Sequence, residues 1–192
     1  MKSTLVGGFA LAALIAAGAH AQQATSRVSA GRVAGDAAAG PVGLTSASTI
    51  GSMNTHAFVE NAARSDMYEI QASKMALARS HNPHVKAFAE RMIRDHTHTT
   101  AELKSHLPPG VAPPSDLDAR RSGMLDNLRE GKEFDKRFVA QQVTAHEEAL
   151  TLMRGFAKRG DNPRLKVLAG QTAPLIEHHL QMAKQLRSQV GG

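Results

Sequence analysis

The stretch that decides the fold is residues 82–96, which read Asn82-Pro83-His84-Val85-Lys86-Ala87-Phe88-Ala89-Glu90-Arg91-Met92-Ile93-Arg94-Asp95-His96. Within it and just beyond, apolar side chains recur every three or four residues, at positions 85, 88, 89, 92, 93, 103 and 107. This spacing gives a helix one buried face. Asn82 is a favourable N-cap, and Pro83 suits the first helical position. We therefore expect a helix over residues 83–107 that carries His96 on its buried face.

The chain repeats this pattern at an offset of 80 residues. The shift aligns Asn82-Pro83 with Asn162-Pro163 and Phe58-Val59 with Phe138-Val139. Further identical pairs are Arg79 with Arg159, Lys86 with Lys166, Ala89 with Ala169, His98 with His178 and Lys104 with Lys184. A repeat at a fixed offset indicates one supersecondary unit used twice, here two helices joined by a short turn. Two such hairpins predict four long helices.

The expected fold class is all-α, a four-helix bundle made of two repeated hairpins. We expect helices over residues 55–80, 83–107 and 132–159 and a fourth from residue 163, and no segment of comparable length alternates as a strand would. The second helix should stop at Pro108-Pro109-Gly110, and Ser115 is the expected N-cap of a short extra helix. A long crossover of this kind lets the middle two long helices run parallel, which predicts an up-down-down-up order.

The N-terminal residues 1–21 are predicted to be a signal peptide. Lys2 precedes an apolar run from Leu5 to Ala17 that is too short to span a bilayer as a retained anchor, and Ala19-His20-Ala21 fits a cleavage site. Residues 22–53 are rich in Ala, Gly and Ser and are expected to be a flexible segment, followed by the bundle over residues 54–190. We expect an exported protein, periplasmic or associated with the outer membrane, without a transmembrane helix in the mature chain.

Composition narrows the possible partners. The chain has no cysteine, which excludes disulfides, thiolate ligands and a lipid-attachment thiol. With one tyrosine and no tryptophan it offers little for stacking on bases, so we expect no nucleic acid partner. The net charge of +6 is spread over outward helical faces and suits either an anionic envelope surface or a protein partner. The oligomeric state stays open.

Three helices each carry one histidine on the apolar face. His96 follows Met92 by one turn, His146 lies between Val143 and Leu150, and His179 lies between Leu175 and Met182, which we expect to be buried. The first helix offers a carboxylate in one of two ways. Either Glu69 faces inward with residues 58, 62 and 72, or Asp66 does so with residues 59, 63 and 70.

Three imidazoles and a carboxylate on facing helices make a donor set for zinc, iron or copper. The candidate metal ligands are Glu69, His96, His146 and His179, with Asp66 and Asp95 as secondary candidates. The alternative is a metal-free, hydrogen-bonded cluster, because a single inward histidine is more often a core residue than a ligand. Its possible hydrogen-bond partners close in sequence are Asp95, Thr99, Thr100 and Glu147.

The sequence resembles an exported bacterial family of unknown function whose members are often labelled outer membrane proteins and which is grouped with the ferritin-like four-helix bundles. The resemblance rests on residues 88–97, on Glu102-Leu103, on Gly131-Lys132-Glu133-Phe134-Asp135, and on Pro174 before His179-Leu180. It implies functional positions at Glu69, Asp95, His96, His146 and His179. The chain departs from the family at one point, since it has Ala145-His146 where Asp-His is usual. Whatever the aspartate orients at that position is either supplied by another group or absent.

No catalytic machinery is evident. Di-iron ferritin-like sites use Glu-x-x-His, but Ile93 and Ile176 occupy the positions three residues before His96 and His179. His98 lies about 200° around the helix from His96 and should face solvent. We therefore expect no catalytic residues, and the cofactor stays open, with a transition metal as the candidate. Two functions remain open, a metal-binding envelope protein for metal handling or stress protection, and a metal-free envelope stress or partner-binding module whose histidines are structural or sense pH.

Overall fold

The computed structural model describes residues 53–191. The predicted signal peptide and, apart from Met53, the predicted flexible segment lie outside these residues. The described part contains five helices and no β-strand. The helices are α2 (Thr55–Arg79), α3 (Pro83–Ser105), α4 (Ala119–Glu130), α5 (Phe134–Arg159) and α6 (Pro163–Val190). The prediction of an all-α fold is confirmed.

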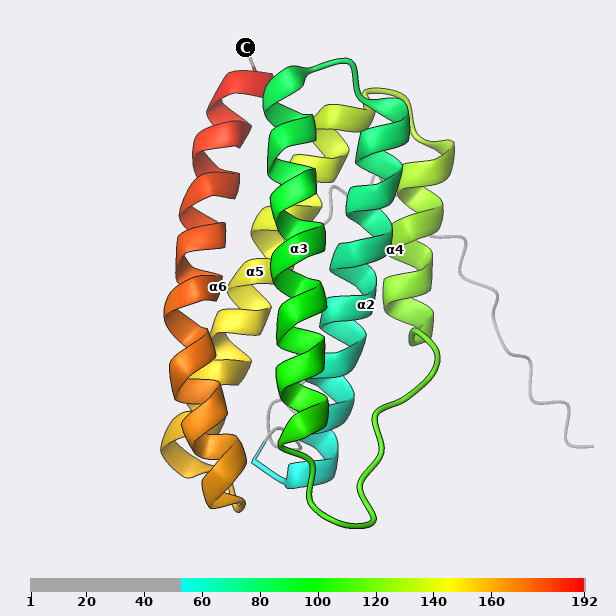
Figure 1. Cartoon of the computed structure of the whole chain (residues 1–192). Coiled ribbons are helices and arrows are strands. Elements are labelled where there is room, and N and C mark those ends of the chain that lie inside the picture. The colour runs from blue at the N-terminus through cyan, green and yellow to red at the C-terminus, as the bar shows by residue number, and fades with distance from the viewer. Residues whose placement is uncertain (1–52, 192) are drawn as a thin grey trace, which may run out of the picture. The chain divides into compact units, whose positions relative to one another are not determined.

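The four long helices form two antiparallel hairpins, α2 with α3 and α5 with α6 (Figure 1). The short helix α4 packs against α2 and α5 and returns the chain along the bundle. As a result α3 and α5 run in the same direction, which confirms the up-down-down-up order (Figure 1). All four long helices can therefore direct side chains into one interior.

The two hairpin turns are built alike, as the repeat predicts. The Asn82 side chain accepts a hydrogen bond from the His84 amide at 2.9 Å, and the Asn162 side chain accepts one from the Leu165 amide at 3.1 Å. A proline opens the helix in both hairpins. Such caps satisfy amide groups that have no partner within the helix. They also fix where α3 and α6 begin, and with that the angular position of each later residue.

Two predicted helix starts are wrong. Helix α4 is capped by Asp118 and not by Ser115, because Asp118 Oδ1 accepts from the Arg121 amide at 2.8 Å. Helix α5 begins at Phe134 and not at residue 132. Glu133 adopts a left-handed conformation with φ 54° and ψ 50°, which a right-handed helix cannot include.

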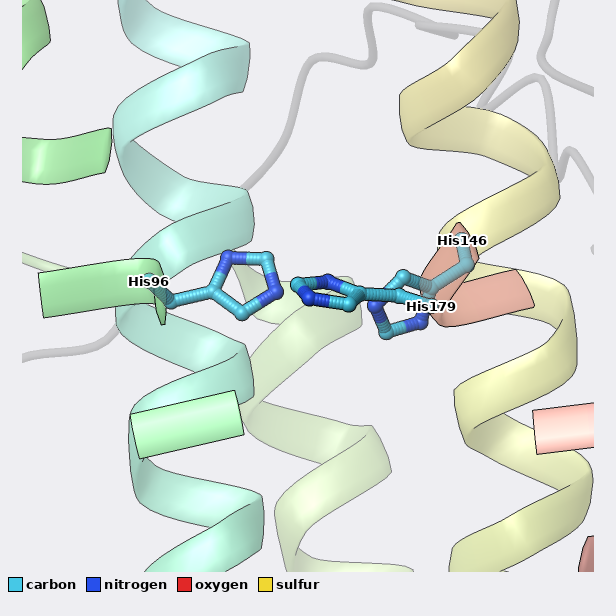
Figure 2. A group of neighbouring side chains, drawn as sticks. All are labelled: His96, His146 and His179. Carbon is cyan, nitrogen blue, oxygen red and sulfur yellow. The ribbon is translucent and has the colours of Figure 1, made fainter. Parts of the chain in front are cut away.

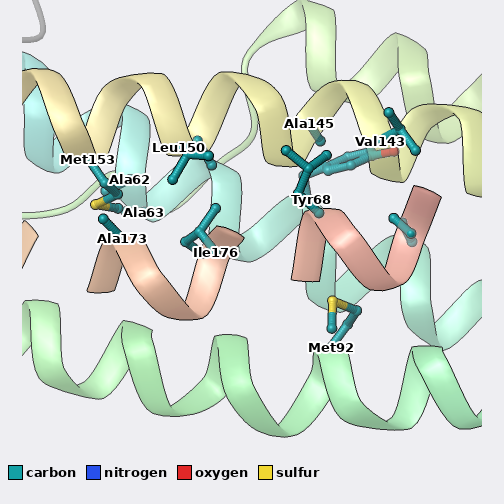
Figure 3. Close-up of a cluster of buried hydrophobic side chains, with 14 of the residues drawn as sticks. Ala62, Ala63, Tyr68, Met92, Val143, Ala145, Leu150, Met153, Ala173 and Ile176 are labelled. Atoms are coloured by element: carbon teal, nitrogen blue, oxygen red, sulfur yellow. The ribbon is translucent and has the colours of Figure 1, made fainter. Parts of the chain in front are cut away.

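The core consists of buried apolar side chains from all the described helices, and Figure 3 shows part of it. At one end Phe58 of α2 stacks on Phe156 of α5 with ring centroids 3.9 Å apart. On α6 the expected inward face is displaced, since Ile176 is buried whereas Leu175 and Met182 are half-buried. Because α6 packs against both α5 and α3, its buried face covers two seams and is wider than a single stripe.

The outer faces of the described helices are polar. Val167 is the exposed large hydrophobic residue in this part of the chain. None of the helices between residues 53 and 191 has both the length and the apolar character needed to cross a membrane.

Candidate metal centre

Three histidines from three helices converge inside the bundle. His96 comes from α3, His146 from α5 and His179 from α6, and Figure 2 shows their rings pointing toward one another. Their ring centroids are 5.4–5.6 Å apart, and one nitrogen from each ring lies within 4.8 Å of the other two. All three residues are at most 1% exposed. The convergence expected from the sequence periodicity is therefore present.

Each ring has one nitrogen engaged outside the triad. The pairs are His96 Nδ1 with Asp66 Oδ1 at 2.8 Å, His146 Nδ1 with the backbone oxygen of Gln142 at 2.8 Å, and His179 Nε2 with Asp95 Oδ2 at 2.9 Å. A carboxylate or carbonyl oxygen only accepts, so each of these nitrogens carries the hydrogen. This fixes the tautomer of each neutral ring and leaves a lone pair on its other nitrogen.

The remaining nitrogens, His96 Nε2, His146 Nε2 and His179 Nδ1, are buried and have no hydrogen-bond partner among the described residues. A buried polar atom without a partner costs about 1–3 kcal/mol. Three lone pairs in one small space suit a cation. Ligand nitrogens at about 2.0–2.1 Å from one ion lie about 3.3–3.6 Å apart, so modest ring movements would bring these three into its coordination shell.

Asp66 is itself held in place. Its Oδ1 accepts from His96, and its Oδ2 accepts from the hydroxyls of Thr99 at 2.9 Å and Thr100 at 3.0 Å. The two threonines expected as partners of the histidines thus bind the carboxylate that orients His96. The order of contacts runs from threonine to aspartate to imidazole, which is the arrangement that usually surrounds metal-binding histidines.

The structure turns both candidate carboxylates of α2 inward. Glu69 is buried, and its Oε1 lies 3.9 Å from His146 Nδ1, but it is not among the groups whose ligand atoms converge. Both its oxygens lack hydrogen-bond partners in the described part, as do Ser73 Oγ and the side-chain amide of Gln142. Glu69 therefore lies beside the triad with unused oxygens. Asp66 accepts a hydrogen bond from His96 Nδ1 and Asp95 accepts one from His179 Nε2, so both carboxylates bind nitrogens that face away from the triad.

The electrostatics keep two of the rings neutral. Burial and the nearby His96 charge lower the pKa of His146 well below its usual value and lower the pKa of His179 to about 4. Burial also acts to lower the pKa of His96, but the hydrogen bond to Asp66 and the surrounding carboxylates outweigh it and raise that pKa. Of the three rings, His96 is therefore the one that binds a proton most readily, so a metal ion competes with protons chiefly at this ring.

Glu69 has an unusual protonation equilibrium as well. Burial raises its pKa to about 7, against the opposing charge of His96. Near neutral pH this carboxyl group is thus partly protonated. The approach of a cation would favour its ionised form.

The surroundings of His146 show how the chain manages without an aspartate at position 145. The acceptor for His146 Nδ1 is the Gln142 carbonyl, one turn earlier on α5. Ala145 instead lines a cavity between α2, α4 and α5. A backbone acceptor has no sequence signal, so sequence patterns could not identify it. Glu147 is exposed and pairs with Lys184 at 2.8 Å.

The remaining nearby histidines take no part. His98 and His178 are exposed, as their positions on the helices predict. They lie at equivalent positions of the two repeats, and both point away from the bundle interior. The candidate site is therefore confined to one imidazole from each of α3, α5 and α6.

Solved structures share this fold. The chain is 20% identical to CopM in the Cu(II)-bound form, over 71% of this chain and 97% of that one, with a TM-score of 0.58. CopM in the Ag-bound form obtained by soaking is 22% identical over 72% of this chain and 97% of that one, with a TM-score of 0.60. CopM in the apo form is 21% identical over 72% of this chain and 99% of that one, with a TM-score of 0.58. At such identities the similarity shows the fold alone.

No curated protein matches the sequence. Residues 41–186 match the family described as Domain of unknown function (DUF4142). The match includes α2, α3, α5, all but the last four residues of α6 and all three converging histidines. The chain therefore belongs to the DUF4142 family.

Proposed function

We propose that this protein binds one transition-metal ion between His96, His146 and His179 and serves in metal handling or stress protection in the cell envelope. One observation carries the proposal. Three buried imidazoles each have one nitrogen fixed by an acceptor and the other free, and the rings converge on one point. A hydrogen-bonded cluster needs donors for its lone pairs, and the described residues provide none for these three nitrogens.

The donor set suits a borderline ion. Neutral imidazole is a good ligand for zinc, copper and iron, and three protein ligands leave a coordination position open. Glu69 is the candidate for a fourth protein ligand, because its carboxylate oxygens have no hydrogen-bond partner among the described residues and Oε1 lies 3.9 Å from His146 Nδ1. Asp66 and Asp95 would act by orienting His96 and His179 and by raising the basicity of these rings.

Copper is the first ion to test. The CopM structures of this fold include Cu(II)-bound, Cu(I)-bound and Ag-bound forms. The ligand atoms that converge are three imidazole nitrogens, which favour Cu(II) or zinc over a soft ion such as Ag(I). We therefore place Cu(II) first, with zinc and Fe(II) for comparison.

The proposed location follows from the N-terminus. Residues 1–21 have the composition of a secretion signal, and export would place the histidine triad in the periplasm or at the outer membrane. The positive net charge would favour contact with anionic envelope material. The order of the long helices also supports a place in the ferritin-like superfamily, without its di-iron chemistry.

The test is metal analysis of protein prepared without a histidine tag. Protein is incubated with Cu(II), Zn(II) or Fe(II), freed of excess metal and measured by elemental analysis. We expect about one ion per chain for the native protein, as three ligands to one ion require, and its loss in His96→Ala. His98→Ala is the matched control, because it removes an exposed histidine two residues away on the same helix.

The alternative function is a metal-free module for envelope stress or partner binding. One observation favours it, since each ring already has one hydrogen-bond partner and His96 can form a buried ion pair with Asp66. In that case the purified protein would carry no metal, and its melting temperature would not change when copper, zinc or iron is added. This result would overturn the metal-binding proposal.

A further inference from the structure

A surface groove runs along the line where α3 packs beside α6 (Figure 1). Its volume is about 460 Å³. Two arginines of α3, Arg91 and Arg94, line it together with two glutamines of α6, Gln185 and Gln189. Each pair is spaced three or four residues apart, which places both members on the same face of their helix. None of the described residues that line the groove is an aspartate or a glutamate, so its permanent charges are all positive.

Arg91 is held in place beside the groove but keeps unused donors. Its Nε lies 3.5 Å from Asp95 Oδ2, and its Nη1 lies 4.0 Å from the sulfur of Met182 on the opposite helix. Asp95 Oδ2 already accepts from His179 Nε2, and Arg91 Nε is buried without a hydrogen-bond partner in the described part of the chain. A guanidinium carries five N–H donors in a rigid fork. Arg91 is therefore a positioned cation that can still donate to an added oxygen.

The second arginine of the groove, Arg94, has no counter-ion among residues 53–191. It is exposed, and Glu90, one turn earlier on α3, forms no ion pair with it. On the α6 side, residues 178–192 include Lys184 and Arg187 but no aspartate or glutamate. The potential at the groove is therefore positive, and it attracts anions.

We propose that the α3–α6 groove is a binding site for an oxyanion of the phosphate class, either free or carried by a lipid headgroup. The guanidiniums of Arg91 and Arg94 contact its oxygens from α3, and the carboxamide N–H groups of Gln185 and Gln189 contact them from α6. The planar fork of arginine matches the spacing of phosphate oxygens. Donors on two walls suit a tetrahedral anion, whereas a single guanidinium fork already satisfies a planar carboxylate.

This inference goes beyond the proposed metal-binding function and does not depend on it. The groove shares no lining residue with the histidine triad. It also gives a location to the attraction for anionic material that the net charge of +6 predicts.

A second cavity lined by arginines fits an anion less well. It lies between α2, α4 and α5, has a volume of about 60 Å³ and includes Glu148 in its lining. Arg120 pairs with Glu148 at 2.5 Å, and Arg121 pairs with Asp118. Carboxylates of the same chain thus balance both of these arginines. In the α3–α6 groove the only such partner among the described residues is Asp95, which Arg91 shares with His179.

The test adds two probes to the metal-free protein at physiological ionic strength. Inorganic phosphate is titrated and followed by NMR of the arginine Nε–H and glutamine amide groups. Vesicles of phosphatidylcholine, alone or mixed with phosphatidic acid, are tested by co-sedimentation. The two probes separate a free oxyanion from a phosphate on a lipid.

Two pairs of variants compare the groove with its surroundings. Gln185→Glu places a negative charge in the groove with almost no change in side-chain size. Gln181→Glu is its matched control, because Gln181 is exposed one turn earlier on α6 and does not line the groove. Arg94→Ala removes a cation from the groove, and Arg187→Ala removes one from an exposed position of α6 outside it.

We expect native protein to bind phosphate, vesicles containing phosphatidic acid, or both. Arg94→Ala should weaken this binding about fivefold, the upper effect of an exposed ion pair, and Gln185→Glu should weaken it at least as much. Gln181→Glu and Arg187→Ala should stay within about twofold of native protein, since salt screens charges outside the groove.

Each result decides the proposal. Groove-dependent binding of inorganic phosphate supports it with a free oxyanion as ligand, and groove-dependent binding of phosphatidic acid vesicles alone supports it with a lipid headgroup. If neither probe binds, or if groove variants and controls behave alike, the groove is not an anion site and the inference is overturned. Metal analysis of the histidine triad is unaffected by either outcome.

Discussion

The imidazole of His96 and the carboxylate of Asp66 form a buried pair, with Nδ1 2.8 Å from Oδ1. The pair joins α3 to α2 and holds the ring in one tautomer and one orientation. Because Nδ1 is committed to Asp66, Nε2 is the nitrogen left for a ligand. The position of the lone pair is thus set from outside the triad.

Weakening this pair should weaken metal binding without abolishing it. In Asp66→Asn the neutral amide can still accept from Nδ1, but it polarises the ring less. We expect about one ion per chain to bind with about 10–100-fold lower affinity, as found for changes around metal-bound histidines. Competition titration against a calibrated chelator measures this. Asp126→Asn, at an exposed site on α4, is the control, and equal affinities in both variants would contradict the role given to Asp66.

The pH dependence of metal affinity should be shallow for a site with three histidines. Three ordinary histidines would each have to lose a proton below pH 6, so log K would rise by about three per pH unit. Burial and the His96 charge lower the pKa of His179 to about 4 and lower the pKa of His146 well below its usual value, which favours the neutral form of both rings. His96 and Glu69 remain as proton competitors.

We therefore expect a slope of about one to two in log K per pH unit between pH 5 and 6, with tighter binding at higher pH. The measurement is a series of competition titrations at half-unit intervals of pH. The His98→Ala variant should show the same slope. A slope near three would mean that the three rings titrate independently of their surroundings.

Glu69→Gln should change how the stability of the metal-free protein depends on pH. Burial raises the folded pKa of Glu69 to about 7 from its ordinary value of 4.5. Between these values the folded protein holds a proton that the unfolded chain releases, so the contribution of Glu69 to stability falls as pH rises. The glutamine variant removes this loss. Relative to native protein it should gain up to about 3 kcal/mol of unfolding free energy between pH 4.5 and 8.

Urea unfolding in the presence of a chelator at pH 5 and pH 8 tests this. Only the difference between variant and native protein is compared, which cancels titrations common to both. Glu90→Gln on the exposed face of α3 is the control and should show no such change. A Glu69→Gln difference that is the same at both pH values would show that Glu69 is already ionised at pH 5.

The two asparagine caps should contribute similarly to stability. Asn82→Ala and Asn162→Ala each remove a hydrogen bond at the start of a long helix. We expect each to lower the unfolding free energy by about 1 kcal/mol, and the double variant by about the sum, since the two turns are separate. Chemical denaturation of the three variants checks this. A double variant much less stable than the sum would show that the turns are coupled.

Most of the fold could be predicted because its signals are local. The Asn-Pro turns and the spacing of apolar residues determine where α3 and α6 begin and which way they face. The crossover was less predictable. Ser115 and Asp118 are both good N-caps, and the choice between them depends on where α4 packs. The left-handed Glu133 that delays the start of α5 likewise has no clear sequence signal.

The candidate site was predictable in the same uneven way. The convergence of His96, His146 and His179 follows from helical periodicity. Helical periodicity could not decide whether Asp66 or Glu69 faces inward. Both do, because α2 packs against both α3 and α5 and its buried face is wide enough for both carboxylates. Pairing of a ring with a distant side chain, as in His179 with Asp95, depends on the packing of α6 against α3.

The duplicated hairpin has a consequence for the origin of the triad. Under the 80-residue shift Asp66 corresponds to His146, Thr99 to His179, and His96 to Ile176. Two identical hairpins associating about a two-fold axis present every side chain twice, so they can offer only an even number of imidazoles. A set of three requires halves with different sequences. Neither hairpin paired with a second copy of itself could therefore form this triad, which depends on the sequence differences between the two halves of the chain.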